Sequence, residues 1–188
     1  MIPEFNSSGV LPPYLDSDPT IIDKMSPYRV SLLEFVQHFA TTEHRKLLLR
    51  GFLNFRLKMK SIGFQTGFQW IDGSFVEDIE KHQERDPADI DLVTFSDLPA
   101  HINSAETWDA FFSENRCVFD TDLSKKEYMC DVYYINARAH PFSIVDQTRY
   151  WFGLFSHQRD TSIWKGIIEI DFEEDESEAL SFVNGGDE

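Results

Sequence analysis

Apolar residues recur every three or four positions in two stretches near the start of the chain. In the first stretch, Leu32, Phe35 and Phe39 predict the core face of a helix over residues 27–40, with Pro27 in the first turn. In the second stretch, Leu48, Phe52, Phe55 and Met59 predict a helix that Thr41 or Thr42 caps, that ends near Ser61, and that Gly63 stops. The chain therefore opens with two helices, the second of them amphipathic.

Further along the chain the period shortens to that of strands. Short β-rich runs predict strands at residues 68–71, 90–95, 128–135 and 164–170. Helices are predicted to start near Phe75, to start at Asn103 with Glu106 completing a capping box, and to span residues 142–155. Helices that lead into a small mixed sheet indicate an α+β (α/β-like) fold with an N-terminal helical layer.

Composition divides the chain into three parts. Residues 1–20 form an extended leader that contains Pro3, Pro12, Pro13 and Pro19 and should lie along the surface of the domain. Residues 21–172 form the folded domain, and residues 173–188 form an acidic tail. The 17 Phe residues and a hydrophobic fraction of 41% exclude a disordered chain.

Charge is unevenly distributed along the chain. The net charge is −16, which argues against general DNA or RNA binding because phosphate contacts need a basic face. Nine acidic and no basic residues lie between Glu169 and Glu188, which favours a solvated, poorly packed and dispensable tail. The alternative is that the tail binds a basic surface, either on a partner protein or on the second helix.

That second helix is the one basic segment of the chain. Between residues 45 and 60 it carries six cations and no acid, namely Arg45, Lys46, Arg50, Arg56, Lys58 and Lys60. Such a face is usually solvated, and here it could also face an anionic substrate.

Two cysteines and the absence of long apolar runs bear on the compartment. Cys117 and Cys130 cannot build a disulfide framework or a four-cysteine zinc site. No apolar run is long enough for a membrane span, and the N-terminal residues lack the pattern of a signal peptide. We therefore expect a cytoplasmic protein with no membrane partner.

Three aspartates are the strongest candidates for chemistry. Asp89 and Asp91 stand two residues apart at the predicted second strand, so their carboxylates share one face of the sheet. Asp131 is a lone acid in the apolar third strand and joins them if the two strands pair. Clustered carboxylates repel, and oxygen-only ligands favour Mg²⁺ or Mn²⁺, so this set predicts a two-metal site for phosphoryl or nucleotidyl transfer.

A Gly-Ser turn precedes these aspartates. Gly73 permits close approach of a phosphate, Ser74 adds a hydroxyl donor, and a following helix would add backbone N–H groups. Lys165 is expected at the surface, with a triphosphate within its reach as the alternative. Gly73, Ser74 and Lys165 are thus the candidate nucleotide-binding residues.

Gly73-Ser74, Asp89-Ile90-Asp91-Leu92 and Asp131 together resemble the signature of the DNA polymerase β-like nucleotidyltransferase superfamily over roughly residues 66–136. Most of the chain also resembles a group of small bacterial nucleotidyltransferase-like proteins. The resemblance implies two Mg²⁺ ions on the three aspartates, an NTP on the Gly-Ser turn, and a proton-accepting role for Asp131. Fourteen residues separate Ser74 from Asp89, more than the minimal motif has.

The leading hypothesis is a metal-dependent nucleotidyltransferase that moves an NMP from an NTP to a hydroxyl on a protein or RNA. The first alternative is a non-catalytic or weakly active protein of the same fold that works by protein contact, such as the partner half of a toxin–antitoxin or phage-defence pair. The second is an interaction domain in which the acid cluster is coincidental.

Overall fold

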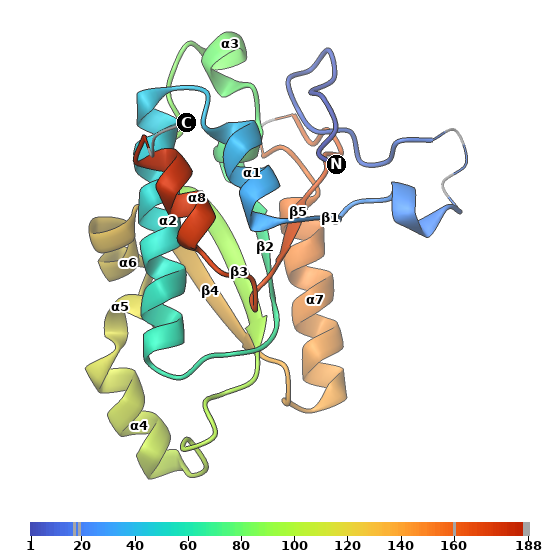
Figure 1. The fold of residues 1–188 in the computed structure, drawn as a ribbon. Helices are drawn as coiled ribbons and strands as arrows, with labels where there is room; N and C mark the ends of the chain where they lie inside the picture. The colour runs from blue at the N-terminus through green and yellow to red at the C-terminus, as the bar shows by residue number, and fades with distance from the viewer. Residues whose placement is uncertain (17, 19, 160, 186–188) are drawn as a thin grey trace.

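A five-stranded mixed sheet forms the centre of the molecule (Figure 1). The structure is a computed structural model that describes residues 1–16, 18, 20–159 and 161–185. The strands lie in the order β1-β5-β2-β3-β4, and β2 runs antiparallel to both of its neighbours. Their bounds are β1 Tyr28–Val30, β2 Phe68–Asp72, β3 Ile90–Ser96, β4 Cys130–Asn136 and β5 Ile168–Asp171. The predicted α+β fold with a small mixed sheet is confirmed.

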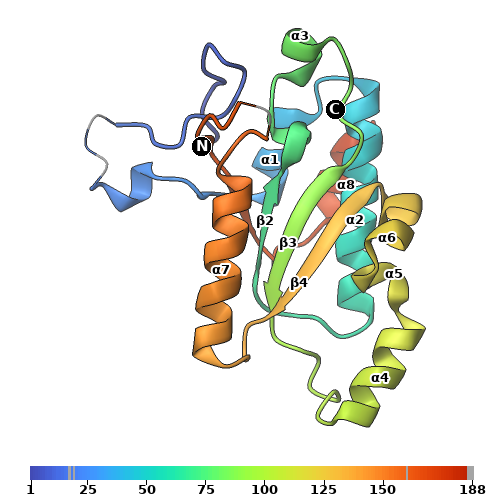
Figure 2. The same ribbon diagram turned by 180° about the vertical axis from the view of Figure 1, so that it is seen from behind.

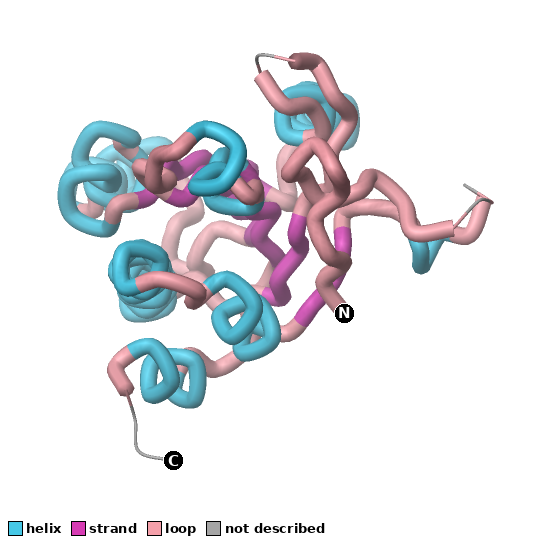
Figure 3. Tube along the Cα trace, turned by 90° about the horizontal axis from the view of Figure 1, so that it is seen from above, coloured by secondary structure: helices cyan, strands magenta, loops and turns pink. Residues whose placement is uncertain are grey.

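Helices cover both faces of the sheet, so the strands lie between two helical layers (Figures 2 and 3). One face packs against a layer that includes α1 (Leu32–Phe39), α2 (Glu43–Ser61), α4 (Ala105–Glu114), α5 (Arg116–Phe119), α6 (Thr121–Tyr128) and α8 (Ser177–Val183). On the other face lies α7 (Pro141–Phe155). The short elements are η1 (Ile22–Lys24), η2 (Gly73–Val76) and α3 (Ile79–Gln83). None of the helices in the described part of the chain has the length and apolar character that crossing a bilayer requires.

Alternation along the strands builds two separate cores. Ile71, Leu92 and Val132 are buried in the core on the α2 side. Trp70 and Val93, their sequence neighbours, are buried in a smaller core under α7. Because successive side chains point to opposite faces, the strand position decides which helical layer each residue meets.

Several predicted boundaries were wrong. The first helix begins at Leu32, because residues 28–30 pair with β5 as a strand and the Ser31 hydroxyl accepts a bond from the Glu34 N–H at 3.1 Å. The capping box of α4 joins Ser104 to Thr107 rather than Asn103 to Glu106. The last strand begins at Ile168, and α5 and α6 occupy a segment to which the pattern gave no helix.

The N-terminal leader is partly built into the domain. Val10 and Leu11 are fully buried, and the carbonyl of Leu11 accepts a bond from the Gly166 N–H. The leader therefore does more than lie along the surface as predicted. Pro19 of the predicted leader lies outside the described residues.

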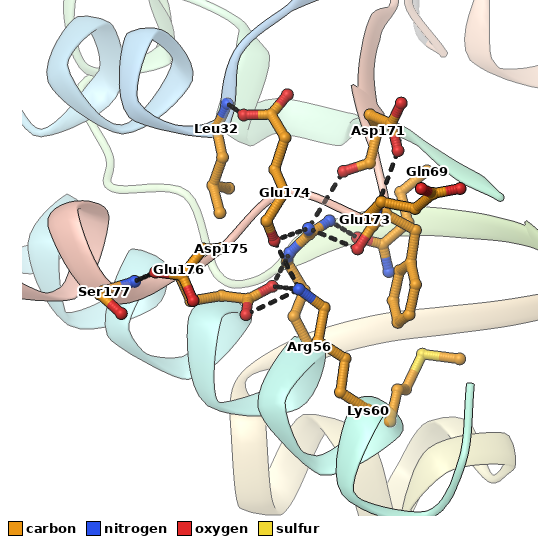
Figure 4. A network of polar contacts seen from close by, with 12 residues as sticks. Leu32, Arg56, Lys60, Gln69, Asp171, Glu173, Glu174, Asp175, Glu176 and Ser177 are labelled. Atoms are coloured by element: carbon orange, nitrogen blue, oxygen red, sulfur yellow. Dashed lines mark hydrogen bonds and ion pairs between the residues drawn. The ribbon is translucent and has the colours of Figure 1, made fainter. Parts of the chain in front are cut away.

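The acidic tail docks onto α2 through a buried arginine, as Figure 4 shows. Arg56 is fully buried, and its Nε lies 2.8 Å from Oε1 of Glu176. Its NH1 donates to Gln69 at 2.8 Å, and its NH2 donates to the carbonyls of residues 171, 172 and 174. Lys60 also pairs with Glu176, at 2.7 Å.

The prediction of a poorly packed tail was therefore wrong for its described part. Glu176 is 2% exposed, and Ala179 and Val183 of α8 belong to the main core. Glu176 of the tail forms ion pairs with Arg56 and Lys60 of α2. Burial of the Arg56 guanidinium without such a partner would cost too much free energy. The predicted solvated basic face was wrong at Arg45 and Arg56, both of which are buried. Residues 186–188 of the predicted tail lie outside the described residues.

We expect Glu176→Gln to lower the free energy of unfolding by about 3 kcal/mol, because it leaves the buried Arg56 guanidinium without its countercharge. The melting temperature should fall by roughly 6–12 °C in a thermal melt. Glu178→Gln, an exposed change in the first turn of α8, which begins directly after Glu176, is the control. Truncation after Phe172 should destabilise the fold at least as much as Glu176→Gln. Equal melting temperatures for both point variants and the wild type would contradict this account.

Candidate functional site

Three carboxylates stand side by side on neighbouring strands. Asp72 at the end of β2 is the register partner of Asp91 on β3, and Asp91 is the register partner of Asp131 on β4. By strand parity all three belong to the α7 face, opposite the buried Ile71 and Leu92. Asp89 directly precedes β3 at the same end. The sheet thus brings together the three predicted aspartates and adds Asp72, to which sequence analysis gave no role.

A lysine bridges the two outer carboxylates of the predicted triad. Nζ of Lys125, on α6, lies 3.1 Å from Oδ2 of Asp89 and 2.7 Å from Oδ2 of Asp131. The Thr121 hydroxyl donates to the other Asp131 oxygen at 2.8 Å. Asp91 has no ion pair of its own among the described residues. Burial, together with the charges of Asp89 and Asp131, raises the pKa of Asp91 to about 6.

Asp72 belongs to a second, buried ion-pair group. Nζ of Lys165 lies 3.2 Å from Oδ2 of Asp72 and 2.6 Å from Oε1 of Glu77, and it donates to the Gly73 carbonyl at 3.1 Å. Lys165 is 2% exposed, so the prediction of a surface residue was wrong. Burial raises the pKa of Asp72 to about 7 although Lys165 opposes that shift. Oδ1 of Asp72 is buried with no hydrogen-bond partner in the part of the chain that is described.

The Gly-Ser turn requires its glycine for two reasons. Gly73 has φ +75°, and a Cβ there would lie 1.8 Å from Oδ2 of Asp91. The turn continues as η2, a 3₁₀ helix of four residues, so the predicted α-helix that begins at this turn was wrong. Arg45 donates to the carbonyls of Phe75 and Glu77, which fixes η2 from the α2 side. The turn is therefore held between two buried cations, Arg45 and Lys165.

These groups line one cleft of about 690 Å³. One wall carries the aspartates and the Gly-Ser turn, together with Lys125 and Lys165. A largely apolar part of the lining is formed by Tyr133 and by Trp151, Gly153, Leu154 and Phe155 of α7. The polar stretch after α3 supplies Gln83 and Arg85, and the segment after α7 supplies Arg159. A ligand in this cleft would meet carboxylates, cations and aromatic rings together.

The metal-ligand role predicted for Asp89, Asp91 and Asp131 remains a prediction. In the described part of the chain, no group of three or more His, Cys, Asp or Glu side chains is arranged to hold a metal ion. The Lys125 ammonium binds two of the three carboxylates instead. The donor set itself, oxygen-only and under mutual repulsion, has the chemistry that Mg²⁺ and Mn²⁺ prefer.

Sequence analysis missed Asp72, Lys125 and Glu77. Asp72 is directly followed by Gly73, yet its face becomes known only from the pairing of β2 with β3. Lys125 lies on α6, a helix that the hydrophobic pattern did not predict. Glu77 alone could have been found from the sequence. It lies three residues after Ser74, and an acid so close to a proposed phosphate-binding turn would need a neighbouring cation.

The chain belongs to the family described as "Family of unknown function (DUF6932)", whose profile matches residues 3–171. Comparison with curated proteins and with solved structures gives no match.

The raised pKa of Asp91 predicts a pH-dependent stability. Its folded value of about 6 lies above the ordinary value of 3.8, so the folded chain binds the extra proton between these two pH values. This group therefore makes the fold less stable as the pH rises from about 4 to about 6. We expect Asp91→Asn to stabilise the metal-free protein at pH 8 by roughly 1–3 kcal/mol and to change little near pH 4.

Urea denaturation of the two proteins at both pH values measures this difference. Asp109→Asn, an exposed change on α4, is the control and should have the same small effect at each pH. A stabilisation by Asp91→Asn that is equal at pH 4 and pH 8 would show that repulsion between ionised carboxylates is not its source.

Proposed function

We propose that this member of the DUF6932 family is a cytoplasmic, metal-dependent nucleotidyltransferase that transfers an NMP from an NTP to a hydroxyl on a protein or RNA. The observation that carries the proposal is the in-register placement of Asp91 beside Asp131, with Gly73 packed against the Asp91 carboxylate. Sequence positions that resemble the superfamily signature thus meet in one cleft.

The three aspartates have different roles in this proposal. Asp89, Asp91 and Asp131 would hold Mg²⁺ or Mn²⁺, which supplies Lewis acidity and charge neutralisation for phosphoryl chemistry. Asp91 is the carboxylate of the three that has no ion pair among the described residues, and burial beside Asp89 and Asp131 raises its pKa. Asp131 accepts the proton of the attacking hydroxyl, and the Thr121 hydroxyl fixes the orientation of its carboxylate.

The Gly-Ser turn, Gly73-Ser74, is the proposed binding site of the triphosphate. The Ser74 hydroxyl is half-buried at the cleft and has no hydrogen-bond partner among the described residues, so it can donate to a phosphate oxygen. Lys165 lines the cleft but is engaged by Asp72 and Glu77. Its proposed part in nucleotide binding is therefore mainly to position the turn, through its bond to the Gly73 carbonyl.

One observation favours a second candidate, a non-catalytic protein of this fold that works by protein contact, as in a toxin–antitoxin pair. The ion pairs of Lys125 with Asp89 and Asp131 neutralise part of the cluster without a metal ion. A basic partner protein could bind the tail only through its exposed acids, because Glu176 is paired with Arg56. These exposed acids are Glu173, Asp175 and Glu178.

Calorimetric titration with ATP, GTP, CTP and UTP, each with Mg²⁺ or with EDTA, tests the proposal. We expect the wild type to bind at least one NTP only in the presence of the metal, because the carboxylates repel a bare triphosphate. Asp89→Asn combined with Asp91→Asn should abolish that binding without lowering the melting temperature.

Asp109→Asn combined with Asp146→Asn is the matched control, since it removes the same charge at two exposed sites. If the wild type binds no NTP with any metal, the second candidate replaces the first. If the Asp89 and Asp91 variant binds as well as the wild type, the site is assigned to the wrong residues.

A further inference from the structure

The apolar wall of the cleft contains an aromatic pair next to the acid cluster. Tyr133 follows Asp131 by two residues on β4, so both side chains stand on the same face of the sheet, and the Tyr133 hydroxyl interacts with the Asp131 carboxylate. Its ring packs against Trp151 of α7 with centroids 4.2 Å apart. Trp151 is 7% exposed and belongs to the core under α7, whereas Tyr133 is 37% exposed. A rigid, buried ring thus supports one that is open to the cleft.

A glycine inside α7 lies on the same wall. Gly153 sits in the last turns of the helix, where glycine is less favourable than alanine. A Cβ at this position would meet no atom within 4 Å, so no packing constraint in the described structure requires glycine. The missing side chain leaves open space at the part of the cleft lining that α7 supplies.

We infer that Tyr133, Trp151 and Gly153 form the subsite for the base of the nucleotide, an inference that rests on the proposed function. The acid cluster and the aromatic pair line one cleft side by side, which matches a ligand with an anionic end and a flat aromatic end. Asp131 and Tyr133 are two residues apart on one strand, so Asp131 would meet the anionic end of the ligand and Tyr133 its aromatic end. Stacking on an aromatic ring accepts every base, because each base has a π-face.

An acceptor side chain is the competing occupant of this wall. The base is favoured because the offset from Asp131 to Tyr133 is short, and a ribose linked to a metal-held phosphate spans such a gap. The space at Gly153 is also open, since no atom of the described residues would lie within 4 Å of a Cβ there, so a flat ring can enter it.

The test compares two ligands that differ only in whether they carry a nucleoside. Binding of a non-hydrolysable NTP analogue and of inorganic tripolyphosphate, each with Mg²⁺, is measured by calorimetry for the wild type, Tyr133→Leu and Gly153→Ala. Both variants should weaken the analogue by about tenfold and leave tripolyphosphate unchanged. Gly153→Ala should also raise the melting temperature by about 1–3 °C, because alanine favours the helix.

Gln147→Ala, an exposed change on α7 away from the cleft, is the control and should alter neither affinity. Tyr133→Phe keeps the ring and should retain the affinity of the wild type for the analogue. If the wild type binds both ligands equally, or the variants lose both, the subsite is overturned while metal-dependent triphosphate binding still supports the proposed function. If the wild type binds neither ligand, the proposed function and the subsite both fail.

Discussion

Repulsion among carboxylates at one end of the sheet is the constraint that shapes the cleft. Asp72, Asp91 and Asp131 are consecutive register partners, and Asp89 stands beside them. Lysines neutralise the flanks of this row, Lys165 at Asp72 and Lys125 at Asp89 and Asp131. The centre of the row, Asp91, has a raised pKa because it is buried beside the charges of Asp89 and Asp131, and Lys125 and Lys165 offset this only in part. The cluster is therefore held by the fold against its own charge, which is a common condition of sites that bind cations or catalyse reactions.

Helix α2 supplies the cations that keep this arrangement in place. Arg45 near its start binds the carbonyls of the η2 segment, and Arg56 near its middle binds the C-terminal segment. Arg56 also donates to Gln69, whose amide donates to the Thr94 hydroxyl across β2 and β3. The strands that carry Asp72 and Asp91 are thus linked to the tail by one buried guanidinium.

Local patterns in the sequence predicted most of the elements, though not, for example, β1, α5 or α6, and part of the site. The two-residue spacing of Asp89 and Asp91 requires only strand geometry, and Asp131 stood out as an acid in an apolar strand. Asp72 could not be placed in the same way, because its face depends on which strands pair. Arg56 was visible as part of a basic stretch, but its burial depends on Glu176, which lies 120 residues away in the chain. The face of a strand on which a side chain lies follows from neighbouring residues in the sequence. Which strands pair, and which charged residues meet, depends on residues far apart in the sequence.

The most direct test of the account is a crystal structure of the protein soaked with Mn²⁺ and a non-hydrolysable NTP analogue. Anomalous scattering would then locate the metal ions. The account predicts manganese peaks within ligand distance of Asp89, Asp91 and Asp131, phosphates at Gly73 and Ser74, and a Lys125 side chain that has left the two carboxylates. A map without manganese in the cleft, in which Lys125 still joins Asp89 to Asp131, would contradict it.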